Sequence, residues 1–127
     1  MKKFLEKMYV NAMDLNDKLV IESVNKIGSL NSILDVGCWD GEKTIKYAKA
    51  CNAKNIYGIE IVEEMSRKAK DKGIKCFSLN VDEDSWPLKN ESIDCVVSNQ
   101  VIEHLTDVDH YFSEAFLVFK KGGFLIT

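Results

Sequence analysis

The chain has 127 residues, of which 46% are hydrophobic, so it is long enough for one domain with a real core. Its net charge of −3 differs from the positive charge that is typical of nucleic-acid-binding domains, and we expect no nucleic-acid partner. The sequence contains no run of about 18 apolar residues and no secretory signal at its N-terminus, so we expect neither a membrane span nor a membrane partner.

The four cysteines are Cys38, Cys51, Cys76 and Cys95, which are widely spaced and form no C-x-x-C pair. This spacing predicts no zinc site, and we expect no other metal site. Three of them lie in or beside predicted strands or a helix, which favours reduced thiols packed in the core of a cytoplasmic protein.

Residues 1–28 are expected to form two N-terminal helices, ahead of a core domain over residues 30–127. The first is a short amphipathic helix that opens with Phe4, Leu5, Met8 and Tyr9. The second has apolar residues at helical spacing from Leu15 to Ile27 and is stopped by Gly28.

The rest of the chain alternates between predicted strands and helices, which indicates an α/β fold with a parallel sheet and right-handed crossovers. The strands are continuous apolar runs, as expected when helices cover both faces of a sheet. The predicted strands are Ile33–Val36, Asn55–Ile61, Ile74–Leu79, Ile93–Ser98 and Phe124–Ile126. The predicted helices are Glu42–Cys51, Glu63–Lys72 and Asp107–Lys120, the last of which Gly122 and Gly123 are expected to end.

The turn after the first strand carries two glycines, Gly37 and Gly41, and two carboxylates, Asp35 and Asp40. The first such turn of a doubly wound sheet is where these folds bind ligands. A turn built for pyrophosphate offers bare N–H groups to an anion. Two carboxylates suit a ligand that carries positive charge instead.

Acidic residues also follow the next two strands. Glu60 ends the second strand and can accept hydrogen bonds from both hydroxyls of a ribose. Asp82 comes just after the third strand, where a carboxylate can accept a bond from an adenine amino group. Because Asp35, Glu60 and Asp82 follow successive strands, we expect all three at the carboxyl edge of the sheet, around a common ligand.

Over residues 30–127 the chain resembles the class I S-adenosylmethionine-dependent methyltransferases, particularly the type that acts on small molecules. The run from Leu34 to Gly41 is similar to the first family motif, of the form LDVGCGTG. The other matching positions are Glu60, Asp82, Pro87, the strand run Glu91–Val96, the run Glu103-His104-Leu105 and the pair Gly122-Gly123.

The resemblance implies a doubly wound, Rossmann-like parallel sheet of order 3-2-1-4-5, with S-adenosylmethionine as cofactor and a small-molecule methyl acceptor as partner. Asp35, Gly37 and Gly41 would shape the methionine pocket, Glu60 would hold the ribose, and Asp82 with Val81 would hold the adenine. The full set of implied cofactor-binding residues is Asp35, Gly37, Cys38, Trp39, Gly41, Glu60, Ile61, Val81, Asp82, Ser98, Asn99 and Gln100.

The chain departs from the family pattern in two places. Trp39 stands where the family has glycine, so its indole either covers the ligand or points away as a packing residue. The hairpin that follows the fifth strand in the family is missing, which leaves Phe124–Ile126 at the edge of the sheet. Such an edge favours self-association. Loss of the hairpin also predicts that this 127-residue form binds cofactor with little or no turnover.

Other interpretations stay open at this level. His104 is a candidate general base or a structural residue, and methyl transfer to a good nucleophile needs mainly alignment. An NAD-dependent oxidoreductase fragment would also place an acid at Glu60, although G-x-G-x-x-G is missing. The domain could also be a shortened, non-catalytic cofactor-binding domain.

Overall fold

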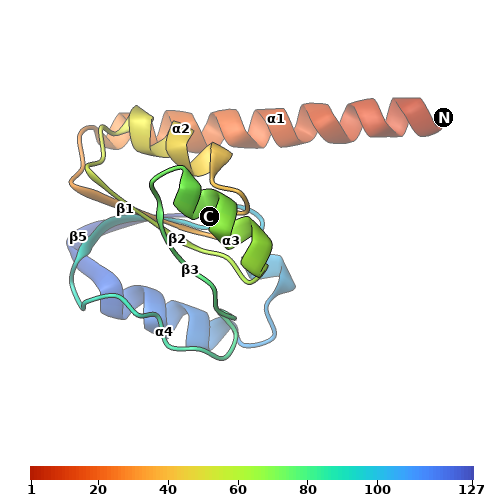
Figure 1. Ribbon diagram of the computed structural model, residues 1–127. Helices are drawn as coiled ribbons and strands as arrows, with labels where there is room; N and C mark the ends of the chain where they lie inside the picture. The colour runs from red at the N-terminus through yellow and green to blue at the C-terminus, as the bar shows by residue number, and fades with distance from the viewer.

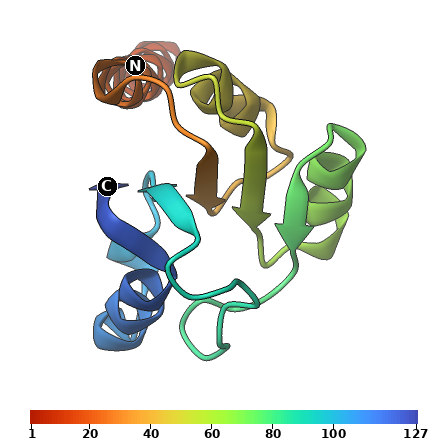
Figure 2. The same ribbon diagram turned by 90° about the vertical axis from the view of Figure 1, so that its left-hand side faces the viewer.

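The computed structural model describes residues 1–127 and shows a five-stranded parallel sheet with helices on both faces (Figures 1 and 2). The strand order is β3-β2-β1-β4-β5, which confirms the predicted doubly wound sheet. The elements are α1 (Lys2–Ile27), β1 (Ser32–Val36), α2 (Glu42–Ala50), β2 (Asn55–Ile59), α3 (Glu63–Asp71), β3 (Lys75–Phe77), β4 (Ile93–Val97), the 3₁₀ turn η1 (Ile102–His104), α4 (Val108–Val118) and β5 (Phe119–Ile126).

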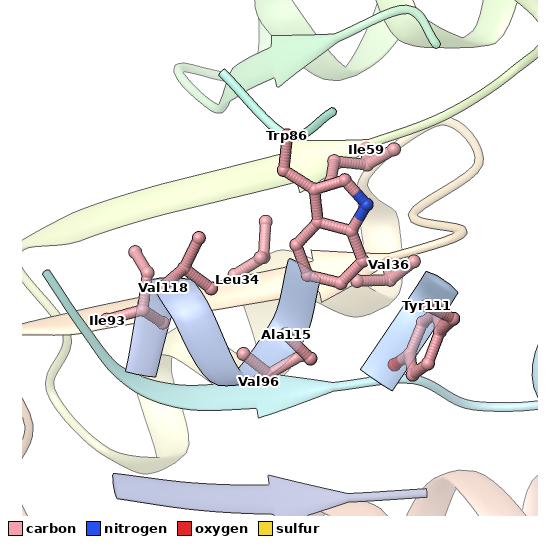
Figure 3. Close-up of a cluster of buried hydrophobic side chains, with 9 residues drawn as sticks. All are labelled: Leu34, Val36, Ile59, Trp86, Ile93, Val96, Tyr111, Ala115 and Val118. Carbon is pink, nitrogen blue, oxygen red and sulfur yellow. The ribbon is translucent and has the colours of Figure 1, made fainter. Parts of the chain in front are cut away.

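Successive residues of β1 bury their side chains on opposite faces of the sheet, which explains why the whole strand is apolar or buried. Leu34 and Val36 join the cluster under α4, whereas Ile33 joins the cluster under α1 and α2. Figure 3 shows the α4-side cluster, which consists of Leu34, Val36, Ile59, Trp86, Ile93, Val96, Tyr111, Ala115 and Val118.

The opposite face of the sheet is covered by α1, α2 and α3. Val20 and Val24 of α1 pack with Tyr47 and Ala48 of α2 in one cluster. A smaller cluster beneath α3 contains Cys38, Ala69, Ile74 and Cys76. The carboxyl ends of β1, β2 and β4 therefore emerge between helical layers, with α1 and α2 on one side and α4 on the other.

The expectation of two N-terminal helices was wrong, because α1 is one continuous helix of 26 residues. No glycine or proline separates the two predicted segments, so no residue between them ends the helix. Every residue from Met1 to Ala12 is exposed, and Figure 1 shows this half of α1 extending beyond the body of the molecule. No helix of the chain combines the length and the apolar character that crossing a bilayer requires.

The junction between α4 and β5 also differs from the prediction. The helix ends at Val118, and Gly122 and Gly123 lie inside β5 rather than before it. The register against β4 shifts between Ile93 and Cys95, and Gly122 takes a left-handed φ of 78° within this irregular stretch. Smaller differences shorten three strands: Asn55–Ile61 ends at Ile59, Ile74–Leu79 contracts to Lys75–Phe77, and Ile93–Ser98 ends at Val97.

Candidate functional site

Two cavities lie side by side at the carboxyl edge of the sheet, and Gly37 and Gln100 line both of them. The first has a volume of about 370 Å³, and the second of about 590 Å³. The remaining lining of the first is Ile59, Glu60, Ile61, Leu79, Asn80, Val81, Asp82, Val101, His104 and Leu105. The remaining lining of the second is Met13, Asp14, Asp17, Asp35, Cys38, Trp39, Asp40, Glu42, Lys43, Lys46, Tyr47 and Asn99.

Backbone hydrogen bonds hold the turn from β1 into α2 against the end of β2. The N–H groups of Gly37 and Cys38 both donate to the carbonyl oxygen of Ile59, at 2.8 and 3.1 Å. A Cβ atom at Gly37, whose φ is 77°, would lie 2.5 Å from Cγ2 of Val101, so this position requires glycine. Because these N–H groups are already used, the turn does not offer them to a pyrophosphate.

Glu60 is a buried carboxylate that follows the last residue of β2. Its Oε2 accepts a hydrogen bond from the N–H of Trp39 at 2.9 Å, and its Oε1 accepts one from the N–H of Val62 at 2.9 Å. A carboxylate has about four acceptor sites, so two stay available toward the first cavity. The sequence predicted the place of Glu60, but it did not predict that the carboxylate also fixes the turn after β1 through the N–H of Trp39.

Asp35 is buried within β1 and points toward α2, where Thr44 donates to its Oδ2 at 2.5 Å. Burial raises the pKa of Asp35 to about 7, and the Thr44 hydrogen bond lowers it only in part. Asp35 also lines the second cavity. A cation placed in that cavity would stabilise the ionised carboxylate.

Asp82 lines the first cavity, but part of its carboxylate is already engaged. Its Oδ1 accepts hydrogen bonds from the N–H groups of Thr106 and Asp107, at 2.9 and 3.0 Å, and the bond from Asp107 contributes most to lowering the pKa of Asp82. Asp82 therefore fixes the loop that leads into α4. Its Oδ2 remains free to accept a further bond.

Helix α1 closes one side of the second cavity through polar contacts that the sequence did not reveal. Asn16 donates to the side chain of Asn99, which follows β4, at 2.7 Å, and Asn99 donates to Asp17 at 3.4 Å. Asp17 also pairs with Lys43 of α2 at 3.0 Å. These contacts join α1, α2 and the β4 edge around one opening.

The second cavity carries more negative than positive charge. Five carboxylates line it, from Asp14, Asp17, Asp35, Asp40 and Glu42, against the two ammonium groups of Lys43 and Lys46. A hydrogen bond from the N–H of Glu42 lowers the pKa of Asp40, and Lys72 pairs with Asp40 at 3.3 Å. Such an excess of carboxylates would attract a positively charged ligand and repel an anion.

Most of the predicted site residues line one of the two cavities, and two of them do not. Ser98 is fully buried, and Gly41 packs against Ala69 of α3. His104 lines the first cavity rather than the second.

Trp39 retains a glycine-like backbone conformation, with a φ of 51°. Trp39 lines the second cavity and is 56% exposed, so much of the residue faces solvent.

Several lining residues carried no recognisable signal in the sequence. Met13, Asp14 and Asp17 come from α1, far from every motif. Leu79, Val101 and Leu105 give the first cavity an apolar wall. The acidic Asp14 and Asp17, three residues apart on one helix, were the only available hint.

Comparisons with known proteins identify the family of the chain. Residues 34–127 match the family model described as a methyltransferase domain. An uncharacterized methyltransferase of Geobacillus sp. (strain WCH70) is 37% identical over 84 residues, which cover 65% of this chain and 38% of the relative. The 27-O-demethylrifamycin SV methyltransferase of Amycolatopsis mediterranei is 30% identical over 100 residues, 72% of this chain and 35% of the relative.

Among solved structures, the YcgJ protein of Bacillus subtilis superimposes with a TM-score of 0.73 at 21% identity, which covers 88% of this chain and 50% of that one. This likeness concerns the fold. The chain thus spans half or less of the length of each of these three proteins. The family model covers most of the chain, and the chain belongs to the class I methyltransferases, whose cofactor is S-adenosylmethionine.

Proposed function

We propose that the chain binds S-adenosylmethionine across the two cavities, as the cofactor-binding part of an activity that transfers the methyl group to a small-molecule acceptor. Adenosine would lie in the first cavity and the methionine part in the second. The observation that carries this proposal is the junction at Gly37 and Gln100, which line both cavities, with Glu60 on one side and Asp35 on the other.

In the first cavity, Glu60 would hold the ribose hydroxyls with the acceptor sites that Trp39 and Val62 leave free. Apolar side chains would contact the two faces of the adenine, and Oδ2 of Asp82 would accept from its amino group. The apolar residues are Ile61, Leu79, Val81, Val101 and Leu105.

In the second cavity, the ionised Asp35 would face the positively charged methionine part, because opposite charges attract strongly at a site with limited solvent. When bound, the cofactor supplies a methyl group activated on a sulfonium. The chain contributes alignment: Asn99 and Gln100 would set the position of the reacting group. His104 faces the first cavity, which favours a supporting role for it over that of a general base.

Two observations support a small molecule as the acceptor. The net charge of −3 and the acidic second cavity disfavour a polyanion. One relative is named for a methylation on rifamycin, a small molecule. The four buried free cysteines fit a reducing compartment, and we place the protein in the cytoplasm.

A methyl-transfer assay tests this proposal. The protein is incubated with S-adenosylmethionine labelled in the methyl group and with separate panels of small alcohols, amines and thiols, RNA, and DNA. Label on a small acceptor supports the proposal, and label on nucleic acid alone contradicts the acceptor class. Cofactor binding with no transfer to any acceptor would favour the non-catalytic alternative.

Self-association through β5 is a second expectation. β5 is the edge of the sheet, and Phe124 on it is 45% exposed. An open apolar edge tends to pair with another chain. Size-exclusion chromatography with light scattering should show dimers that the Phe124→Lys variant loses and the Phe4→Lys variant keeps, since Phe4 lies on α1. A monomer at high concentration would contradict this expectation.

A further inference from the structure

Two cysteines from distant parts of the chain meet beside the candidate cofactor turn. Sγ of Cys38, in the turn after β1, lies 3.5 Å from Sγ of Cys76 in β3, and either thiol can donate to the other. Both residues are buried, at 4% and 5% exposure. The other two cysteines, Cys51 and Cys95, belong to a different cluster on the α1–α2 side of the sheet.

A glycine makes this meeting possible. Gly58 of β2 pairs in register with Cys76 of β3 on one side and with Asp35 of β1 on the other. A Cβ atom at position 58 would lie 2.7 Å from Sγ of Cys38. The two sulfurs therefore approach each other across β2 only because β2 has no side chain at that point.

The surroundings favour ionisation of one of the two thiols. Cys38 and Ser66 both lie within hydrogen-bond distance of Sγ of Cys76, and the Ser66 hydroxyl donates at 3.3 Å. The hydrogen bond from Cys38, together with the one from Ser66, lowers the pKa of Cys76, and the bond between the thiols raises the pKa of Cys38. A thiolate is the reactive form of cysteine, so Cys76 is the better nucleophile of the pair.

We propose that Cys38 and Cys76 form a reversible disulfide under peroxide and that this bond weakens binding of the cofactor. The Cys76 thiolate attacks one peroxide oxygen, the O–O bond breaks, and a sulfenic acid and hydroxide form. Cys38 then attacks the sulfenic sulfur, the S–O bond breaks, and the thiol proton leaves with the oxygen as water. In sum, two thiols are oxidised to one disulfide and hydrogen peroxide is reduced to two waters.

The effect on the cofactor rests on the proposed function and follows from the position of Cys38. Bond formation brings the sulfurs from 3.5 Å to about 2.05 Å and pulls on the turn. The neighbouring Trp39 N–H is bonded to Glu60, so the shift disturbs the carboxylate that would hold the ribose. Cys38 also lines the second cavity, and bound cofactor should in turn slow oxidation.

The experiment treats the protein with hydrogen peroxide and maps its peptides by mass spectrometry without reduction. We expect a cross-link between the peptides that carry Cys38 and Cys76, with a loss of two hydrogens that dithiothreitol reverses. The Cys51→Ala/Cys95→Ala variant should still form it, and the Cys76→Ala and Cys38→Ala variants should not. Free or over-oxidised thiols without this cross-link would overturn the proposal.

Calorimetry with S-adenosylmethionine tests the second half on the same samples. The oxidised protein should bind at least fivefold more weakly than the reduced protein, and reduction should restore the affinity. Peroxide should leave the affinity of Cys76→Ala unchanged. Equal affinity of oxidised and reduced protein would overturn the link to the cofactor. If the reduced protein binds no cofactor, the proposed function fails, while the cross-link is still decided by the peptide map.

Discussion

The backbone N–H of Trp39 donates to Oε2 of Glu60 at 2.9 Å, which joins the turn after β1 to the end of β2. The same carboxylate holds Val62, at the start of α3, through its other oxygen. One buried side chain therefore fixes both the turn after β1 and the start of α3, before any ligand is bound.

Replacing Glu60 with glutamine should weaken binding of S-adenosylmethionine by roughly 1–3 kcal/mol, since a charged acceptor is lost and one backbone N–H faces an amide NH₂. Calorimetry measures the affinity of both proteins. Glu63→Gln is the control, because Glu63 is exposed in the first turn of α3. Equal affinities of Glu60→Gln and the unaltered protein would contradict the role of Glu60.

Asp35 should make stability fall as the pH rises from about 4 to about 7. Burial raises the pKa of Asp35 from 3.8 to about 7, so in this window the folded protein keeps a proton that the unfolded chain has released. The loss is at most about 1.4 kcal/mol for each pH unit, or roughly 4 kcal/mol in all.

Urea unfolding of the unaltered protein and of Asp35→Asn between pH 4 and pH 8 measures this contribution. The difference in unfolding free energy between the two should change across the window in favour of the variant as the pH rises. Asp71→Asn is the control, because Asp71 is exposed at the end of α3. A difference for Asp35→Asn that is constant with pH would contradict the raised pKa.

Gly41→Ala should destabilise the fold more than Gly73→Ala. Both glycines have a left-handed φ, of 81° and 87°, so alanine at either position is forced into an unfavourable backbone conformation. Only at Gly41 would the new Cβ also meet Ile74 and lie 3.1 Å from the Cβ of Ala69. We expect a further loss of roughly 1–3 kcal/mol at Gly41 from this overpacking. Thermal unfolding of the two variants compares their losses of stability directly. Equal losses would show that Ala69 and Ile74 can shift to make room for the new Cβ without destabilising the fold.

Trp39 should report cofactor binding by a change in fluorescence. It lines the second cavity and is 56% exposed, whereas the other tryptophan, Trp86, is buried in the α4-side cluster. Titration with S-adenosylhomocysteine should therefore shift or quench the emission of the unaltered protein and leave that of Trp39→Phe nearly unchanged. A full signal in Trp39→Phe would show that the indole points away from the ligand.

The sequence was sufficient for the sheet and for the acids at its edge, because both follow from local patterns. Apolar runs alternate with helical periodicity, and Asp35, Glu60 and Asp82 each fall within or just after their strand. The sequence did not reveal the contacts between Asn16 and Asn99, which lie 83 positions apart. Such a contact depends on where a long helix docks, and no local pattern encodes it.

The roles of individual carboxylates were also only partly predictable. That Glu60 and Asp82 lie at the sheet edge follows from strand ends, but their hydrogen bonds to Trp39 and Thr106 depend on the path of loops. Helix α1 was predicted as two helices although no residue between them ends a helix, and Phe4 and Leu15 lie about three turns apart on nearly the same face. Its N-terminal half is exposed and so lacks the buried apolar face by which a helix is usually recognised.

Calorimetric titration of the reduced protein with S-adenosylmethionine is the most direct test of the central claim, that the junction at Gly37 and Gln100 holds this cofactor. The account predicts saturable binding of one cofactor per chain, weakened by Glu60→Gln and unaffected by Glu63→Gln. An absence of binding heat and of any thermal shift at millimolar cofactor would contradict it.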